Sequence, residues 1–457
     1  VIFTINKIQD PLIKSPRKAS WDGITVTKKD DETVVFTLGK PFISFMNNTT
    51  IGILPEHLWS KVSAPEFGLS TLNIKGVGTG PYKVSSITKN NDGIPVEYEL
   101  VRFTNFVLGS PHIKYLNIIS YANEHDLVEA LRSHSVDQAG GISPENASTL
   151  KDSSYKISTS TLPRIFGIFY NSANSKIFQD SSVVSAINMA LDRQAIVDEV
   201  LDGYGTVVSS PVPSTILKDS SISVEKDGQV DEASKLLEKA GWIMGTDGIR
   251  SKGSTTTTTI KKKVGKKIVL QKVTIPSKDP TERLSFTLTT GDTPELKNTS
   301  MMIKEQLAKI GVEVDVSKIY ETGTLNQKII RARDYEALLF GQVVNNESDL
   351  YAFWHSSQRS DPGLNIAMYS NRDVDTLLES IQKTLSYDNR ADKYKALVKL
   401  FNKDTPAILI YSPKYLYATN LSLDHVSAGS ISTPSDRFLS IYTWYASKDH
   451  VWKIFTK

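Results

Sequence analysis

The residues best suited to binding chemistry are aromatic side chains that stand beside small polar ones. They occur where strands are predicted to end, at Tyr170 and Asn171, at Phe340 and Gln342, at Tyr369, and in residues 351–355 and 442–445. Aromatic residues dominate protein cores by buried area, so each one alone is compatible with simple packing. Several of them at the carboxyl ends of α/β strands suit a cleft in which a small ligand binds.

Motifs for catalysis are missing from the sequence. There is no GxSxG, HExxH or CxxC, and the chain contains no cysteine. The KGST of residues 252–255 lacks the leading glycine and the context of a nucleotide-binding P-loop. The seven histidines lack metal-ligand spacing, and only His355, in FWHSSQ, lies within an aromatic cluster, where it either faces a ligand or packs locally. We therefore predict a protein that is not an enzyme and has no cofactor or metal site, with a hydrolase as the alternative.

The stretch NIKGVGTGPYKV, residues 73–84, resembles a phosphate-binding loop because Gly76, Gly78 and Gly80 alternate. A dinucleotide fingerprint requires a helix directly after the glycines. Here Pro81 is followed by alternating residues that predict a hairpin around NNDG. We interpret the stretch as a domain junction in which Gly78 and Gly80 adopt dihedral angles closed to other residues.

Length and charge limit the class of protein. A chain of 457 residues exceeds what one hydrophobic core usually organises, so two or three domains are expected. Its 53 basic and 50 acidic residues leave a net charge of +3, too balanced for a nucleic-acid partner. No apolar run approaches the ~20 residues of a membrane-spanning helix.

Alternating β-prone and helical segments predict an α/β protein. Residues 1–60 form a small α+β unit with strands at 23–27 and 33–38. In residues 180–201, apolar residues recur at three- and four-residue spacing and predict one apolar helix face, comprising Val183, Val184, Ile187, Leu191 and Ala195. The helix DEASKLLEKAG is expected to end with a left-handed cap at Gly241.

Residues 251–283 contain a five-threonine run and a cluster of lysines. An isolated basic run is usually a solvated face, so we predict a solvated loop or an added hairpin in preference to a phosphate or heparin site.

Taken in order, many segments resemble the extracellular solute-binding proteins of family 5, the peptide-, oligopeptide- and nickel-type binding components of ABC importers. The resemblance covers nearly the whole chain. It rests on segments that include DPLIKSPRKASWDGITV, GTGPYKV, VVSAINMALDRQAIVDEVLDGYGTVVSSPVP, EASKLLEKAGW, ELKNTSMMIKEQLAKIGVEVDV, RARDYEALLFG, DLYAFWHSSQ, YSNRDVDTLLES, DTPAILIYSPKYLYATN and STPSDRFLSIYTWY.

The resemblance implies a two-lobed periplasmic-binding-protein-like fold of type II, with mixed sheets flanked by helices and an extra subdomain. The expected parts are residues 1–70 for a partial extra subdomain of lobe I, 71–165 for lobe I, 166–408 for lobe II and 409–457 for the return to lobe I. Family members carry a further N-terminal portion, so the chain is expected to lack that part and any export signal or anchor upstream.

The resemblance also implies a function and a site. It implies a monomeric extracytoplasmic protein that captures peptides by hinge closure and delivers them to the permease subunits of an ABC transporter. The alternative ligand is a sugar or a metal chelate, and the alternative role is that of a surface sensor. Asn345 stands where peptide-binding relatives place an acid that pairs with the peptide amine. Either Glu347 or Asp349 replaces that acid, or the ligand is not an ordinary peptide with a free amine. The expected ligand-binding residues are Tyr170, Asn171, Phe340, Gln342, Asn345, Trp354, His355 and Tyr369 in lobe II, with Arg437 and Tyr442 from the returning segment of lobe I.

Overall fold

The structure is a computed structural model that describes residues 1–446 apart from 40–44, 151–154, 214–215, 218–226, 254, 265–266, 277–281, 345–346, 421–422 and 427–430. The chain divides into two compact units. Unit 1 comprises Val1–Leu162 and Tyr415–Lys457, and unit 2 comprises Pro163–Lys414. Unit 2 is therefore a contiguous insert in unit 1, while the finer four-part division expected from the sequence stays a prediction.

The first part of unit 1 is a small α+β arrangement around one aromatic cluster. Its elements are α1 (Ile2–Gln9), β1 (Ile24–Lys28), β2 (Val34–Leu38), α2 (Phe45–Asn48) and α3 (Glu56–Trp59). The antiparallel pairing of β1 with β2 confirms the two predicted strands. Trp21 is fully buried with Ile5 and Ile24, and its ring contacts Phe36 and Phe45.

The remainder of unit 1 contains a three-stranded antiparallel sheet and the strands that the chain adds on its return. The elements are β3 (Tyr82–Lys89), β4 (Pro95–Arg102), β5 (Tyr115–Ile119), α4 (Glu124–Arg132), β6 (Gln138–Gly140), α5 (Pro144–Leu150), β7 (Tyr155–Thr161), β20 (Leu423–Asp424), the 3₁₀ helices η7 (Pro434–Phe438) and η8 (Ile441–Thr443), and β21 (Tyr445–Ala446). The predicted NNDG hairpin is confirmed, because β3 pairs with β4 and Gly93 between them takes a φ of 78°.

The glycine stretch before β3 corrects one expectation and supports another. None of Gly76, Gly78 and Gly80 has a φ in the left-handed region, and a Cβ at Gly78 or Gly80 would meet open space. The prediction that these two glycines supply dihedral angles closed to other residues was therefore wrong. The chain continues directly into β3 and not into a helix, so the context of a dinucleotide site is absent from this described segment.

Unit 2 is built on a mixed sheet. Its strands are β8 (Arg164–Tyr170), β9 (Gly205–Val207), β15 (Ser285–Gly291), β16 (Glu313–Asp315), β17 (Ile319–Tyr320), β18 (Ala337–Val343) and the first half of β19 (Ala407–Asn420). The order is β16-β15-β18-β8-β19, with β17 beside β15 and β9 beside β19. The contacts of β15 are parallel, whereas β18, β8 and β19 pair antiparallel. Past Lys414, β19 enters unit 1 and pairs with β6 and β7.

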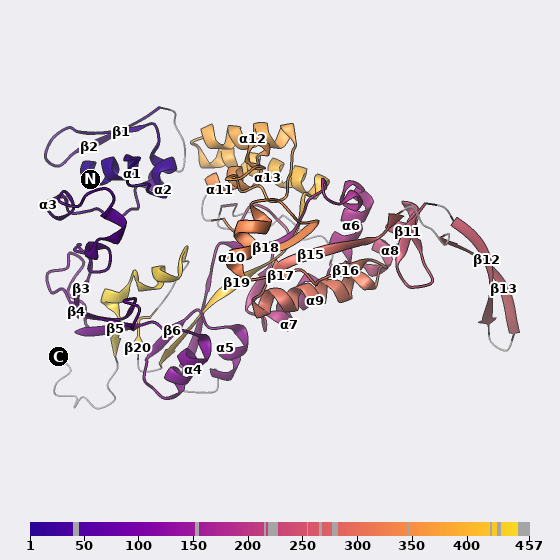
Figure 1. Cartoon of the computed structure of the whole chain (residues 1–457), viewed down its shortest axis with the longest axis horizontal. Helices are drawn as coiled ribbons and strands as arrows, with labels where there is room; N and C mark the ends of the chain where they lie inside the picture. Colours follow the sequence, from indigo (N-terminus) through magenta and orange to yellow (C-terminus); the bar gives the residue numbers. More distant parts are fainter. Residues whose placement is uncertain are drawn as a thin grey trace. The chain divides into compact units, whose positions relative to one another are not determined.

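Helices cover both faces of this sheet, as Figure 1 shows. One face packs against α6 (Ser181–Ala190), α7 (Arg193–Val200), α8 (Val230–Lys239) and α9 (Pro294–Ala308), and the other against α11 (Glu347–Trp354), α12 (Arg372–Lys383) and α13 (Tyr387–Asp404). The sequence RIFGIFY of β8 explains why both faces are filled. Ile168 and Tyr170 belong to the first core, and Ile165 and Phe169 belong to the second, as strand alternation requires.

The predicted single helix face of residues 183–195 is divided between two helices. α6 ends at Ala190, Leu191 is extended, and the Asp192 carboxylate caps α7 by accepting the backbone N–H of Ala195. The N-cap preference of aspartate decides this break, because its side chain satisfies a backbone donor of the new helix. The other predicted ending is confirmed, since Gly241 after α8 has a φ of 88°.

The remaining elements of unit 2 are short, apart from one long hairpin. They are β10 (Ile243–Met244), β11 (Arg250–Lys252), β12 (Thr255–Val264), β13 (Lys267–Pro276), β14 (Glu282–Arg283), the single-turn α10 (Thr322–Thr324) and a π-helix at Leu325–Ile330. The threonine- and lysine-rich stretch forms the hairpin of β12 and β13, which was one of the two predicted outcomes. Within the described residues, every helix is too short or too polar to cross a membrane.

Candidate ligand-binding site

Two groups of predicted ligand-binding residues, at the end of β8 and in β18, lie on neighbouring strands that run in opposite directions. Tyr170, the last residue of β8, pairs with Ala337, whereas Gln342 pairs with Ile165. At about 3.4 Å per residue, the strand from Ala337 to Gln342 separates these positions by roughly 17 Å. The structure therefore does not bring Tyr170 and Gln342 together.

Gln342 lies next to the last residue of β18, as the sequence suggested, whereas Phe340 lies in the middle of the strand, because β18 continues to Val343. Gly341 between them has a packing role. A Cβ there would lie 2.7 Å from the Phe166 ring, which stacks on Tyr411 at 5.3 Å between ring centroids. The glycine between Phe340 and Gln342 is therefore explained by close packing against Phe166.

Tyr170 and Asn171 are occupied with interactions inside unit 2. The Tyr170 ring stacks on Phe178 at 5.0 Å between centroids, and burial raises the pKa of its phenol far above the usual range. Asn171 Nδ2 donates to the Arg333 carbonyl at 3.0 Å, and its Oδ1 accepts the Ala173 N–H at 3.1 Å. Asn171 thus holds the end of β8 to the segment before β18, and Tyr170 packs against the segment that follows β8.

A second group of predicted residues does gather on one face of the sheet. Phe340, Trp354 and Tyr369 all belong to the core beneath α11–α13. Gln342 is buried and donates from Nε2 to the Leu364 carbonyl at 3.4 Å. The Tyr369 hydroxyl donates to Asp404 Oδ2 at 2.6 Å, and burial together with this bond raises the pKa of the Tyr369 phenol. Asn345 lies outside the described residues.

His355 lies at the end of α11 with carboxylates near its outer nitrogen. Its ring stacks on Tyr351 at 4.1 Å between centroids, and Nδ1 accepts the Ser357 N–H at 3.1 Å. Nε2 lies 3.9 Å from Asp375 Oδ1 and 3.6 Å from Glu379 Oε1, beyond hydrogen-bond distance. The neighbouring Trp354 is a core residue that packs edge-on to Phe401.

Arg437 of unit 1 lies in an aromatic cage. Its guanidinium is 4.2 Å from the Phe438 ring centroid, 5.8 Å from that of Tyr417 and 6.0 Å from that of Tyr415. Nη1 donates to the Tyr415 hydroxyl at 2.8 Å and to the Pro434 carbonyl at 2.9 Å. Burial raises the pKa of the Tyr415 phenol despite the opposing charge of Arg437.

The charge of Arg437 is not neutralised within the part of the chain that the structure describes. No carboxylate there lies within ion-pair distance of it, and its buried Nε finds no acceptor. A guanidinium with spare donors and a cation–π cage suits a planar anion such as a carboxylate. This group is the strongest candidate for direct contact with a ligand.

Tyr442 lies near apolar side chains that face solvent. Its ring meets that of Phe106 edge-on at 5.4 Å between centroids. Val107 and Leu108, which follow Phe106, are 86% and 62% exposed, and Leu439, two residues after Arg437, is 77% exposed. Unit 1 therefore presents a cation together with exposed apolar groups.

The cage includes residues that sequence reasoning missed, namely Gly140, Tyr415 and Tyr417. A Cβ at Gly140 would lie 2.1 Å from the Tyr415 hydroxyl oxygen and 3.2 Å from Arg437 Cζ, so only glycine leaves room for both. The alternation of Tyr415 and Tyr417 in KYLYATN was a usable signal, since residues two apart on a strand share a face. Their pairing with β6 was not visible in the sequence.

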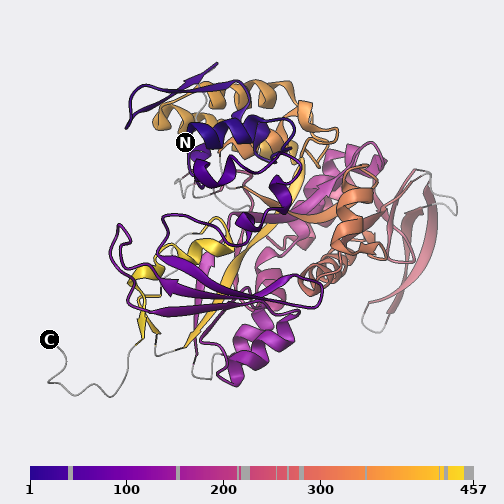
Figure 2. The same cartoon turned by 60° about the vertical axis from the view of Figure 1, so that its left-hand side comes forward.

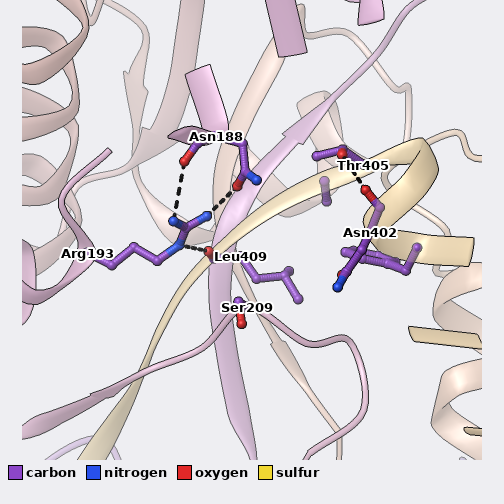
Figure 3. Close-up of a pocket in the computed structure, with 8 residues that line it drawn as sticks. Asn188, Arg193, Ser209, Asn402, Thr405 and Leu409 are labelled. Atoms are coloured by element: carbon purple, nitrogen blue, oxygen red, sulfur yellow. Dashed lines mark hydrogen bonds between the residues drawn. The ribbon is translucent and has the colours of Figure 1, made fainter. Parts of the chain in front are cut away.

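Figure 3 shows a pocket in unit 2 beside Arg193. Its volume of about 30 Å³ corresponds to about one water molecule, far below the ~300 Å³ of a typical solute site. Arg193 there is 3% exposed and has three kinds of partner: Nε donates to the Leu409 carbonyl at 2.7 Å, and the terminal nitrogens bond Asn188 and Asp227. This arginine therefore connects α7 to β19, and we assign it a structural role and not a ligand-binding one.

Metal ligands do not converge in the described ranges, where no group of three or more histidine, aspartate or glutamate side chains could hold an ion.

Comparison with known proteins places these features in context. The model of the bacterial extracellular solute-binding proteins, family 5, matches residues 1–362. The oligopeptide-binding protein AppA of Bacillus subtilis is 26% identical over 98% of this chain and 77% of its own length. The nickel-binding protein NikA of Staphylococcus aureus is 21% identical over 77% of this chain and 62% of its own length. The structure of B. subtilis AppA in complex with a nonapeptide superposes with a TM-score of 0.69 at 23% identity, covering 98% of this chain and 83% of that one.

Proposed function

The chain belongs to the bacterial extracellular solute-binding proteins of family 5, and we propose that it captures peptides as the substrate-binding component of an ABC importer. The observation that carries this proposal is the family match over residues 1–362, joined to the similarity of 98% of the chain to an oligopeptide-binding protein. The similarity to a nickel-binding protein covers less of the chain at lower identity, so a metal chelate is the second choice.

Capture by hinge closure is supported by the way the chain connects the two units. The chain crosses from unit 1 to unit 2 after Leu162 and returns after Lys414 within the single strand β19. A ligand that binds the closed arrangement better than the open one shifts the population toward closure. Permease subunits that recognise only the closed form would then accept loaded protein, outside the cytoplasm and without chemistry on the solute.

On the unit 1 side, the proposed contacts are Arg437 and Tyr442. Arg437 would bind a carboxylate of the peptide through the N–H groups that the protein leaves free, because a charged donor pairs strongly with a carboxylate. The exposed side chains of Val107, Leu108 and Leu439 would cover apolar parts of the same ligand.

On the unit 2 side, the proposed contacts are the half-buried Phe340 and Tyr369 together with Gln342 and His355. Ligand contact by Tyr170, Asn171, Asn345 and Trp354 stays a prediction from the sequence. The first two already have partners within unit 2, and Trp354 is part of its core.

Isothermal titration calorimetry tests the proposal. Peptides of two to nine residues should bind at one site, and the complex of nickel with histidine should not. A peptide whose terminal carboxylate is amidated should bind more weakly if Arg437 holds that group. Saturable binding of a sugar or of nickel–histidine, with none of the peptides, would contradict the proposal.

A further inference from the structure

Arg437 lies on the 3₁₀ helix η7, and the chain on both sides of η7 is anchored in unit 1. Ile431 before η7 and Ile441 after it are buried in one cluster with Tyr415 and Tyr417. Figure 2 shows this returning segment in yellow beside the purple three-stranded sheet of unit 1, which packs against the same cluster. Because both anchors are held by core contacts, the turn between them sets the position of the guanidinium.

The carboxylate of Asp436, the residue next to Arg437, closes this turn. Its Oδ2 accepts the N–H of Ser432 at 2.8 Å and the N–H of Thr433 at 2.9 Å. Its Oδ1 accepts the Thr433 hydroxyl at 2.9 Å. Thr433 and Asp436 thus form a capping box, in which the side chain of each bonds the backbone of the other. These bonds tie the chain before η7 to the residue that precedes Arg437.

The same bonds direct the charge of Asp436 away from Arg437. Among the residues that the structure describes, no carboxylate lies within ion-pair distance of the Arg437 guanidinium, that of Asp436 included. Burial raises the pKa of the Asp436 carboxyl, but the bonds from Thr433 and Ser432 outweigh burial and hold that pKa below its usual value. Asp436 is therefore an ionised cap of the turn that leaves the neighbouring cation available to an anion.

The side chain of Arg437 does not hold its own position through Nε. That nitrogen is buried and has no acceptor in the described residues, which is unfavourable for a polar group. The Phe438 ring, 4.2 Å from the guanidinium, comes from η7 itself. The Tyr415 hydroxyl and the space left by Gly140 fix the opposite side. The cage is therefore complete only while η7 keeps its shape.

We propose that Asp436 is a positioning residue for ligand capture, because closing η7 holds the Arg437 guanidinium in its aromatic cage. The inference rests on the proposed contact between Arg437 and a peptide carboxylate. The competing role for Asp436 is that of a counter-charge, which would weaken the attraction of Arg437 for anions. The two roles predict opposite results when Asp436 is removed. Loss of positioning weakens carboxylate binding, whereas loss of a counter-charge strengthens it.

Two substitutions of Asp436 separate these roles in titration calorimetry with one peptide, used as the free acid and as the amide. Asp436→Ala removes the cap and should weaken binding of the free acid by about tenfold, as expected for a charged hydrogen bond, with less than about twofold change for the amide. Asp436→Asn keeps an acceptor for the backbone N–H groups and removes the charge, so affinity for the free acid should stay within about threefold of wild type.

Two further variants show whether the effect belongs to this turn. Thr433→Val removes one bond of the capping box, so its affinity for the free acid should lie between those of wild type and Asp436→Ala. Glu66→Gln is the matched control, because this exposed carboxylate accepts the Ser63 hydroxyl at 2.6 Å beside another 3₁₀ helix of unit 1. It should leave the preference for the free acid over the amide unchanged. Circular dichroism checks that all variants are folded.

A second measurement needs no peptide. Nuclear magnetic resonance follows the buried Arg437 Nε–H, whose signal is assigned by its loss in Arg437→Met. Exchange of this hydrogen with solvent should be about tenfold faster in Asp436→Ala than in wild type, and unchanged in Asp436→Asn and Glu66→Gln. If the wild type binds no peptide, the proposed function fails, and this exchange rate still decides whether Asp436 positions Arg437.

The results that would overturn the proposal are distinct from that failure. They are tighter binding of the free acid by Asp436→Ala, an equal loss of affinity for acid and amide, a loss in Asp436→Asn as large as that in Asp436→Ala, or an unchanged exchange rate in Asp436→Ala.

Discussion

Arg193 in unit 2 and Arg437 in unit 1 are cations of the same type in opposite situations. Arg193 is 3% exposed, faces the Asp227 carboxylate and donates to the Leu409 carbonyl. Arg437 is surrounded by aromatic rings, donates to one hydroxyl and one carbonyl, and has no acidic partner in the described residues. Both sit beside β19, one near each half of that strand.

This difference distinguishes an arginine that stabilises the fold from one that is available to bind a ligand. A buried cation whose donors are paired contributes to stability, because its removal would leave its partners buried without a donor. A cation held in place by rings and neutral oxygens keeps its charge available for an incoming anion. We therefore expect Arg193 to contribute to stability and Arg437 to contribute to ligand affinity.

The largest effect is expected from Arg193→Met. It leaves the partly buried Asp227 carboxylate and the Leu409 carbonyl without their donor, so the free energy of unfolding should fall by about 3–5 kcal/mol. Urea unfolding followed by circular dichroism measures it. The control Arg331→Met removes a side chain that is 67% exposed and should change stability by less than about 1 kcal/mol. Equal losses in the free energy of unfolding for the two variants would show that Arg193 contributes no more to stability than an exposed arginine.

The next effect is expected from Arg437→Met on peptide affinity. Loss of a hydrogen bond from a charged donor weakens binding by about 1.5–3 kcal/mol, or roughly 10- to 150-fold in the dissociation constant. Titration calorimetry with a peptide that binds the wild type measures it, and Arg132→Met, on an exposed helix pair, serves as the matched control. An unchanged affinity would remove Arg437 from the site and make it a second structural arginine.

Gly140→Ala should affect both properties to a smaller degree. The new Cβ collides with the Tyr415 hydroxyl and approaches Arg437, so the cage must shift, at a cost of about 1–3 kcal/mol in stability. Peptide affinity should fall several-fold because the guanidinium moves with Tyr415. The control Gly52→Ala adds a Cβ in open space, and an equal result for both glycines would mean that the cage tolerates the insertion.

The smallest effect concerns the pH dependence of a surface ion pair in unit 2. Burial alone would raise the pKa of the Asp180 carboxyl, but Lys252, the Trp242 indole N–H and the Ser182 amide together hold that pKa below its usual value. A depressed pKa in the folded state means that the contribution to stability is present above the unfolded pKa and is lost as the pH falls through the lower, folded pKa.

Asp180→Asn should therefore cost about 0.5–1 kcal/mol at pH 7, and the difference from wild type should shrink below about pH 4. Urea midpoints at pH 7, 5, 4 and 3 measure it. A difference in stability between variant and wild type that stays constant with pH would mean that Asp180 acts as the cap of α6 and not through its charge.

Local sequence rules predicted much of the fold. A strand was predicted to end at Tyr170 and Asn171, and β8 ends at Tyr170, with Ile165 and Phe169 in one core and Ile168 in the other. Gly93 and Gly241 have the positive φ values expected at a hairpin turn and a helix end. These features depend on neighbours a few residues away, which a sequence displays directly.

The site was harder to predict because its geometry depends on pairing between distant segments. Phe340 seemed to end a strand, but β18 continues to Val343, and the ring of Phe166 on the neighbouring strand packs over Gly341. The cage around Arg437 combines Gly140 with Tyr415, which are far apart in the chain. Only the register of β6 against β19 shows that they meet.

Mass spectrometry of the purified protein under native conditions directly tests whether the chain captures peptides. We expect additional mass on the folded chain that is released on unfolding and is identified by sequencing as peptides. The Arg437→Met variant should carry less of it than the wild type. Reproducible release of sugars or of a nickel chelate, with no peptide, would contradict it.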